Sequence, residues 1–144
     1  MNPDQQKLVR DSFAKVRPID KTAASLFYDR LFELNPKLRP LFKGDMEEQG
    51  RKLMAMLGLV VTDIHRLNKL VPAIRDLGRR HAAYGVSDSD YETVASALLW
   101  TLEKGLGDEF TDDTRRAWEN CYSFLAMEMK SAANEQQSLL IPPC

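Results

Sequence analysis

The sequence predicts a protein built from α-helices alone, and three observations indicate this. Apolar residues recur with a spacing of three or four along most of the chain, which is the period of a helix with one buried face. Proline, asparagine, aspartate and glycine stand between these stretches, as they do at helix ends. The alternation of apolar and polar residues that is typical of strands is absent from the sequence. We therefore expect about seven or eight helices around one core.

The first helices have clear start and stop signals. Asn2, followed by a proline, is expected to cap the first helix, which Pro18 ends. Asp20 is expected to cap the second helix, whose wide apolar face continues until Asn35. A short helical turn over residues 36–42 then leads into a polar corner.

The middle of the chain contains a helix that is apolar on more than one side. It is expected over residues 46–63, and residues 54–61 are almost entirely apolar, which is typical of a central helix. A shorter helix follows, in which Val71 and His81 lie on one apolar stripe, and Gly85 ends it.

The last two helices have the strongest cap signals. Residues 87–90 and 89–92 both fit the reciprocal capping pattern that opens a helix, here over residues 90–106. Thr111 is expected to cap a final long helix with two aspartates in its first turn. We expect that helix to end near Ala133.

The composition restricts the chemistry. The chain has 144 residues, which suits one domain, and its 20 Lys and Arg balance 21 Asp and Glu. We therefore expect no nucleic-acid or membrane partner. With 2 His and 2 Cys, neither a multi-thiolate zinc site nor a disulfide framework can form. No glycine-rich phosphate loop, nucleophile elbow or zinc-protease motif is present in the sequence. Metal or cofactor chemistry must therefore use His65 or His81.

The two ends of the chain carry little functional signal. The N-terminus lacks the apolar segment of a secretory signal, and no run is long enough to cross a membrane, so we expect a cytoplasmic protein with reduced thiols. Residues 136–144 end in two prolines and Cys144. We expect a disordered tail there, with a docking segment or an intermolecular disulfide as the alternatives.

Two side chains have both an ordinary and a functional interpretation. His81 is either a histidine at the edge of the core, bonded to the backbone, or the single axial ligand of a large apolar cofactor such as haem. Tyr28 is either a core tyrosine or a polar group that faces a pocket. His65 lies in a polar stretch, and we expect it at the surface.

The order of these features resembles a globin. Pro36 and Phe42 around the short third helix, and the segments LGRRHAAYGV (residues 77–86) and FTDDTRRAW (residues 110–118), carry the resemblance. The two segments resemble the neuroglobin-like branch and the single-domain bacterial globins. The resemblance covers about residues 3–133 and implies a globin domain over residues 1–135, with three helices packed over three around haem b.

The resemblance also implies roles for individual residues. His81 would bind the haem iron and donate its Nδ1–H to the carbonyl of Leu77. Tyr28, Gln49 and Leu53 would form the distal side, where O₂ binds. The remaining haem-pocket positions are Phe42, Lys52, Leu77, Arg80, Val86, Tyr91 and Val94. Of these, Lys52 and Arg80 would pair with the haem propionates.

The sequence departs from the family pattern at two points. Neuroglobins usually hold iron between two histidines, but Gln49 occupies the distal position in this chain. His65 lies 16 residues after Gln49, which is ~24 Å along the expected helix, so it is too far away to be the second histidine ligand. Tyr28 or Lys52 remains an alternative sixth ligand. Flavohaemoglobins support the proximal histidine with a tyrosine and a glutamate; Tyr122 is a candidate for the first, but Ala133 stands where the glutamate is expected.

The resemblance implies a protein that binds O₂, NO and CO reversibly, with high O₂ affinity and slow release, in O₂ transport or storage. The alternative is NO detoxification as an NO dioxygenase, or nitrite reduction, with a separate reductase. Gas sensing and a helical interaction module without haem are further alternatives. We expect a monomer or a weak dimer.

Overall fold

The computed structural model describes the backbone of residues 1–140 and the side-chain surroundings of residues 1–135. Within this part of the chain there are helices and no strands, so the predicted all-α class is confirmed. The α-helices are α1 (Pro3–Val16), α2 (Asp20–Leu34), α3 (Met46–Thr62), α4 (Leu67–Ala83), α5 (Asp90–Leu106) and α6 (Asp112–Leu140). Four short 3₁₀ helices connect them: η1 (Arg17–Ile19), η2 (Pro36–Leu41), η3 (Ile64–Arg66) and η4 (Gly107–Glu109).

Most predicted elements are found, with three differences in extent. The short third helix is the 3₁₀ helix η2, so six α-helices form in the described residues. The helix that carries His81 begins at Leu67, before the stripe that predicted it, and includes Pro72 in its interior. The last helix extends to Leu140 instead of ending near Ala133.

The extension of α6 has a simple local cause. No glycine or proline follows Thr111 until Pro142, and the intervening residues include strong helix formers. The division into a domain over residues 1–135 and a tail over residues 136–144 stays a prediction, and Cys144 lies outside the described residues.

Two of the predicted helix caps are confirmed. The Asn2 side chain accepts a hydrogen bond from the Gln5 amide at 2.8 Å. The hydroxyl of Thr111 accepts one from the Thr114 amide at 3.2 Å. Both bonds satisfy backbone N–H groups that have no partner inside the helix.

Two other cap predictions are wrong in detail. Asp20 is the first residue of α2 and not its cap, and its carboxylate accepts only from the adjacent Lys21 amide. Ser89 makes no capping hydrogen bond; instead the carboxylate of Asp90 accepts one from the Ser87 amide at 2.8 Å. In the predicted capping pattern, this is the hydrogen bond from the backbone of the first residue to the side chain of the fourth. It holds the chain in place before α5.

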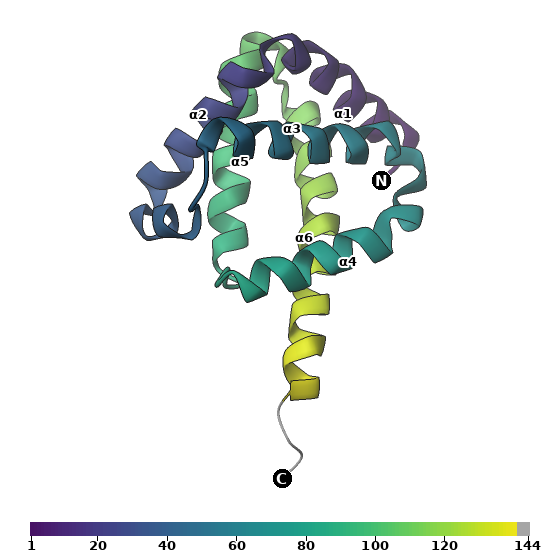
Figure 1. Cartoon of the computed structure of the whole chain (residues 1–144). Coiled ribbons are helices and arrows are strands. Elements are labelled where there is room, and N and C mark those ends of the chain that lie inside the picture. Colours follow the sequence, from purple (N-terminus) through teal and green to yellow (C-terminus); the bar gives the residue numbers. More distant parts are fainter. Residues whose placement is uncertain (141–144) are drawn as a thin grey trace.

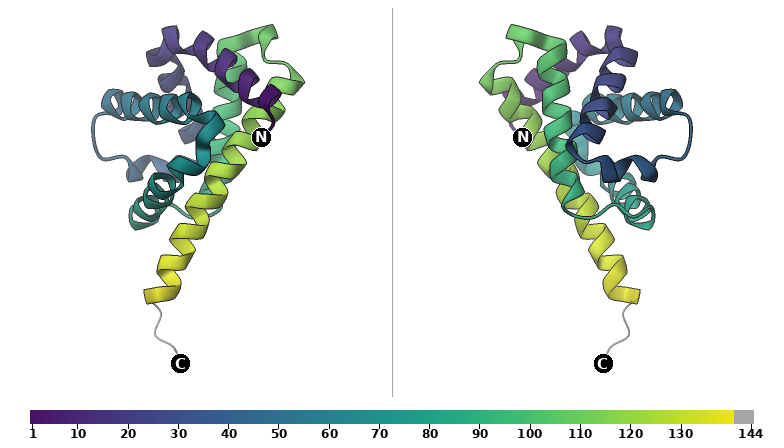
Figure 2. Two further views of the ribbon diagram at one scale, coloured as in Figure 1. Left: turned by 90° about the vertical axis from the view of Figure 1, so that its right-hand side faces the viewer. Right: turned by 90° about the vertical axis from the view of Figure 1, so that its left-hand side faces the viewer.

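Helices α3 and α4 lie one above the other, and α5 and α6 run behind both of them (Figure 1). Helix α2 packs against α3 and α5, whereas α1 and α4 pack mainly against α6. The C-terminal part of α6 extends beyond α4 in both side views (Figure 2). None of the helices in the described part of the chain is long and apolar enough to span a membrane.

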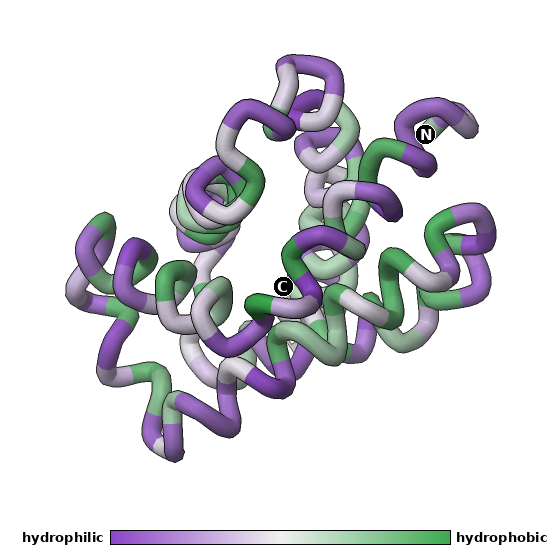
Figure 3. The backbone as a smooth tube through the Cα atoms, turned by 90° about the horizontal axis from the view of Figure 1, so that it is seen from above, coloured by the Kyte–Doolittle hydropathy of each residue, from purple (hydrophilic) through white to green (hydrophobic). Residues whose placement is uncertain are grey.

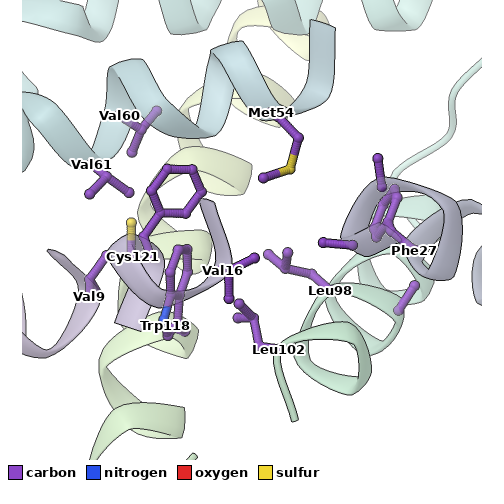
Figure 4. Packing of buried hydrophobic residues seen from close by; sticks show 14 of the residues in the cluster. Val9, Val16, Phe27, Met54, Val60, Val61, Leu98, Leu102, Trp118 and Cys121 are labelled. Atoms are coloured by element: carbon purple, nitrogen blue, oxygen red, sulfur yellow. The ribbon is translucent and has the colours of Figure 1, made fainter. Parts of the chain in front are cut away.

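The main core lies where α1, α2, α3, α5 and α6 meet (Figure 4). Hydrophobic and hydrophilic positions alternate along the helices, as expected when one face of each is buried (Figure 3). Trp118 is almost fully buried, and its indole N–H donates to the Ser12 hydroxyl at 2.8 Å, which satisfies the polar group of this large side chain. Cys121 is 1% exposed and belongs to this core.

A second, smaller cluster joins α4 to α6 and to the start of α5. It consists of Ile74, Tyr91, Ala126 and Met129. Leu77 and Val86, which flank His81 in sequence, pack against it. This cluster therefore supports the helix that carries the histidine.

Candidate functional site

His81 lies in the last turn of α4 and is held by its own helix. Its Nδ1 is 2.9 Å from the carbonyl oxygen of Leu77, and a carbonyl accepts, so Nδ1 carries the proton in the neutral ring. The hydrogen bond expected from the sequence is therefore present. Burial lowers the pKa of His81, the bond to Leu77 opposes this, and the charge of Arg80 lowers the pKa further. The result is a neutral imidazole with Nε2 available as a metal ligand.

The chain leaves α4 through a sharp turn beside this histidine. Gly85 has φ 100°, a conformation that favours glycine, and the Val86 amide donates to the His81 carbonyl at 3.0 Å. A Cβ on Gly85 would lie 3.5 Å from the side chain of Leu41. The turn after α4 therefore lies beside the last residue of η2.

Phe42, which directly follows η2, belongs to an aromatic cluster. Its ring centroid is 5.3 Å from that of Tyr28, in an edge-to-face arrangement, and 5.4 Å from that of Phe32. The Tyr28 and Phe32 rings are stacked at 6.0 Å. Such pairs fix the orientation of the Tyr28 ring.

Tyr28 and Gln49 are brought together although 21 residues separate them in the sequence. Tyr28 is 7% exposed, and burial raises the pKa of its hydroxyl, while a side-chain hydrogen bond with Gln49 acts in the opposite direction. Helices α2 and α3 approach closely at this point, because a Cβ on Gly50 would be 2.9 Å from that of Ala24. The close crossing places the beginning of α3 against Tyr28.

The predicted apolar pocket residues pack against the two hydrophobic clusters. Leu53 and Val94 are half-buried and pack against the main core. Leu77 and Val86 are half-buried against the smaller cluster, of which Tyr91 is a buried member. These residues thus lie on α3, α4 and α5 and in the turn between α4 and α5.

Tyr122, the candidate for the tyrosine that supports the proximal histidine in flavohaemoglobins, makes its hydrogen bond elsewhere. Its hydroxyl donates to the backbone carbonyl of Tyr91 at 2.8 Å, so it ties the first turn of α5 to α6. The amine of Lys130 lies 5.5 Å from the centre of the Tyr91 ring on the same side of α6. Sequence reasoning missed this connection, because spacing along the chain says nothing about contacts between α5 and α6.

The two residues expected to pair with the haem propionates are both exposed. Arg80 forms an ion pair with Asp76 at 3.2 Å on the same helix. Lys52 lies on the exposed side of α3. Their contacts with a cofactor stay predictions. His65, in η3, is exposed as expected.

Gly78 allows α4 to pack closely against α6, and sequence reasoning missed this role. A Cβ at this position would lie 2.5 Å from the Cα of Met129, so only glycine permits α4 to cross α6 this closely. The sequence does contain a signal for this role, because a glycine inside a predicted helix often marks a close contact, and Gly78 precedes the candidate ligand by three residues. The sequence does not indicate that the contact is with Met129 of α6.

A groove of about 520 Å³ lies between α2 and α3. Tyr28 and Met54 are among its lining residues, and His81 is not. It is therefore separate from the side of the molecule on which α4 carries the histidine.

Comparison with known proteins identifies the family. A model of the globin family matches residues 25–129. Neuroglobin of Danio rerio is 30% identical over 136 residues, which cover 85% of this chain and 86% of that protein. A flavohemoprotein of Bacillus subtilis is 25% identical over 123 residues, but these are 83% of this chain and 31% of the larger protein.

A solved structure extends the likeness over the whole fold. An engineered carbene transferase, derived from a putative nitric oxide dioxygenase of Rhodothermus marinus, has a TM-score of 0.87 and 27% sequence identity. The match covers 97% of this chain and 98% of that one. The chain belongs to the globin family, whose members carry haem and bind diatomic gases, and its fold is the globin fold.

The donor set of the site fits haem. Among the described residues, no group of three or more His, Cys, Asp and Glu side chains could hold a metal ion. A single neutral imidazole suits a metal whose other ligands come from an organic cofactor. Half-buried apolar side chains on α3, α4 and α5 supply the contacts that the flat faces of such a cofactor require.

Proposed function

We propose that the protein binds haem b through Nε2 of His81 and uses Tyr28 and Gln49 to retain O₂. Haem supplies an iron centre that binds O₂, NO and CO reversibly. The observation that carries the proposal is the His81 ring on α4, whose Nδ1 is bonded to the Leu77 carbonyl, with Tyr28 on α2 and Gln49 on α3 close enough for Gln49 to affect the pKa of the tyrosine.

The two distal side chains determine how long a ligand stays. The hydroxyl of Tyr28 and the amide of Gln49 are donors that can turn from each other to a polar diatomic ligand. If each bond contributes about 1.5 kcal/mol, the pair slows O₂ release about 100-fold relative to an apolar pocket. CO is less polar and gains less. High affinity and slow release suit retention of O₂ better than its bulk delivery.

Tyr28 serves in this proposal as a donor and not as a sixth ligand of iron. Burial raises the pKa of its hydroxyl, so the phenol keeps its proton at neutral pH and can donate. Lys52 lies on the exposed side of α3 and would have to leave water to reach the pocket. We therefore propose five-coordinate ferrous iron, which the visible absorption bands of the deoxy protein test.

The cofactor and its ligand are tested by reconstitution. The purified protein is titrated with haem, and a Soret band of one-to-one stoichiometry is expected. His81→Gly should lose the spectrum of a histidine-bound haem and regain it when free imidazole is added. His65→Gly is the matched control and should behave as the unsubstituted protein. A protein without any Soret band after haem addition would contradict the proposal.

A second function, NO dioxygenation, is favoured by the likeness to the putative nitric oxide dioxygenase over 97% of this chain. We propose it as the alternative, together with a neuroglobin-like or single-domain bacterial place within the family. Multiple turnovers require a reductase, and the flavohemoprotein that this chain matches is much longer than the matched part. NO consumption measured with NAD(P)H and cell lysate distinguishes the two functions: repeated turnover supports the enzyme, and a stop after one equivalent supports simple binding.

A further inference from the structure

The groove between α2 and α3 has a charged rim and a buried floor. Its rim consists of exposed charged side chains: Asp20, Lys21, Asp29, Arg39, Glu47 and Arg51. Its floor consists of Ala24, Tyr28, Gly50 and Met54, which are all buried. The groove therefore leads from solvent to the rear of the distal tyrosine.

The small residues of the two helices keep the groove open. Ala24 and Gly50 meet at the helix crossing, and neither has a side chain that extends into the space beside it. Ser25, on the wall, is small and exposed. Larger side chains at these positions would fill the groove.

Met54 is the movable part of the floor. It is 9% exposed, lines the groove, and extends from α3 into the core (Figure 4). Methionine has an unbranched, flexible side chain, and its rotamers change faster than ligands exchange. Its motion would open a passage beside Tyr28 for a molecule of two atoms.

The other approach, between η2 and the turn after α4, is lined by large side chains. A Cβ on Gly85 would lie 3.5 Å from the side chain of Leu41, and the rings of Phe32, Phe42 and Tyr28 pack on one another. A ligand entering there must displace an aromatic cluster, whereas a ligand in the groove must displace one flexible side chain.

We propose that the α2–α3 groove is the route by which neutral diatomic gases reach Tyr28 and Gln49, with Met54 as the gate. The proposal rests on the proposed function. The charged rim does not hinder an uncharged gas, and the apolar floor favours its transfer out of water.

The rates of CO exchange test the route in the haem-loaded protein. Ser25→Trp places a large side chain in the groove, and Thr22→Trp places one on the exposed part of α2 outside it. After flash photolysis, Ser25→Trp should lower the CO association rate constant about tenfold, as an added barrier of about 1.4 kcal/mol does. The dissociation rate constant should fall by the same factor, because a blocked route changes the barrier and not the end states. Thr22→Trp should leave both unchanged.

Xenon provides a measurement that does not depend on the cofactor. Under xenon pressure, the amide resonances of Ala24, Gly50 and Met54 should shift and saturate, with or without haem, and Ser25→Trp should abolish the shifts. Wild-type CO rates in Ser25→Trp, or a change in its CO affinity with no common slowing, would overturn the route. Failure of the unsubstituted protein to bind haem or CO would overturn the proposed function instead, and the route with it.

Discussion

Gly78 and Met129 meet where α4 packs against α6. A Cβ on Gly78 would lie 2.5 Å from the Cα of Met129, a distance that real contacts do not tolerate. Since His81 follows Gly78 by three residues on the same helix, this crossing sets the depth and direction of the candidate iron ligand. The nearby ion pair of Arg75 with Glu128, at 3.2 Å, joins the same two helices.

Gly78→Ala should destabilise the protein although alanine is the better helix former. The methyl group must push α4 away from α6, and such overpacking costs about 1–3 kcal/mol. The free energy of unfolding in urea measures the loss. Gly105→Ala, inside α5, is the matched control: its Cβ would meet Ile19 at 3.6 Å, an ordinary contact, so it should gain about 0.5–1 kcal/mol. Equal effects of the two variants would disprove the role of the crossing.

Tyr28→Phe should release O₂ about tenfold faster. The ring and its aromatic neighbours remain, and a donor worth about 1.5 kcal/mol is removed. Stopped-flow displacement of O₂ by CO measures the rate. Tyr84→Phe removes the same atom at an exposed site and should change nothing. An unaltered O₂ off-rate in Tyr28→Phe would exclude the hydroxyl from ligand retention.

The apoprotein should lose stability at acid pH in part through His81. The folded state lowers the pKa of this group, so the unfolded chain takes up a proton first as the pH falls below about 6.5. The stability contribution is present above the unfolded pKa and is lost as the pH falls through the folded one. Unfolding free energies measured across this range should fall less steeply in His81→Gln. Parallel curves for the two proteins would show that His81 is protonated as easily in the folded state.

Cys121 should be unreactive until the protein unfolds. Burial raises the pKa of its thiol to about 12, and the thiolate is the reactive form. In a Cys144→Ser variant, Cys121 is the remaining thiol of the sequence, and its labelling by a disulfide reagent should follow the fraction unfolded in urea. Rapid labelling in the absence of denaturant would indicate that the core around Trp118 opens locally.

The start and end signals of the helices were sufficient for most of the fold. The bounds of α5 were predicted correctly, because Asp90 and Gly107 act on the backbone next to them. The extent of α6 was missed, although its cause is equally local: no helix breaker precedes Pro142. Such features depend on interactions within a few residues.

The candidate site required more than local signals. The bond between His81 and Leu77 spans one helical turn and was expected for that reason. The contact of Tyr28 with Gln49 was anticipated only by family resemblance, since the two residues are on different helices. The connection of Tyr122 to Tyr91 was not anticipated, because which carbonyl a hydroxyl reaches depends on how α5 and α6 pack.

The sequence by itself thus determined the helical class, most helix ends and which of the two histidines is half-buried, since each follows from periodicity, caps and composition. The tertiary structure decided which side chains meet: Gly78 with Met129, Leu41 with Gly85, and the buried floor of the groove behind Tyr28. These relationships arise where helices cross, and the crossing points depend on the volumes of side chains far apart in the sequence.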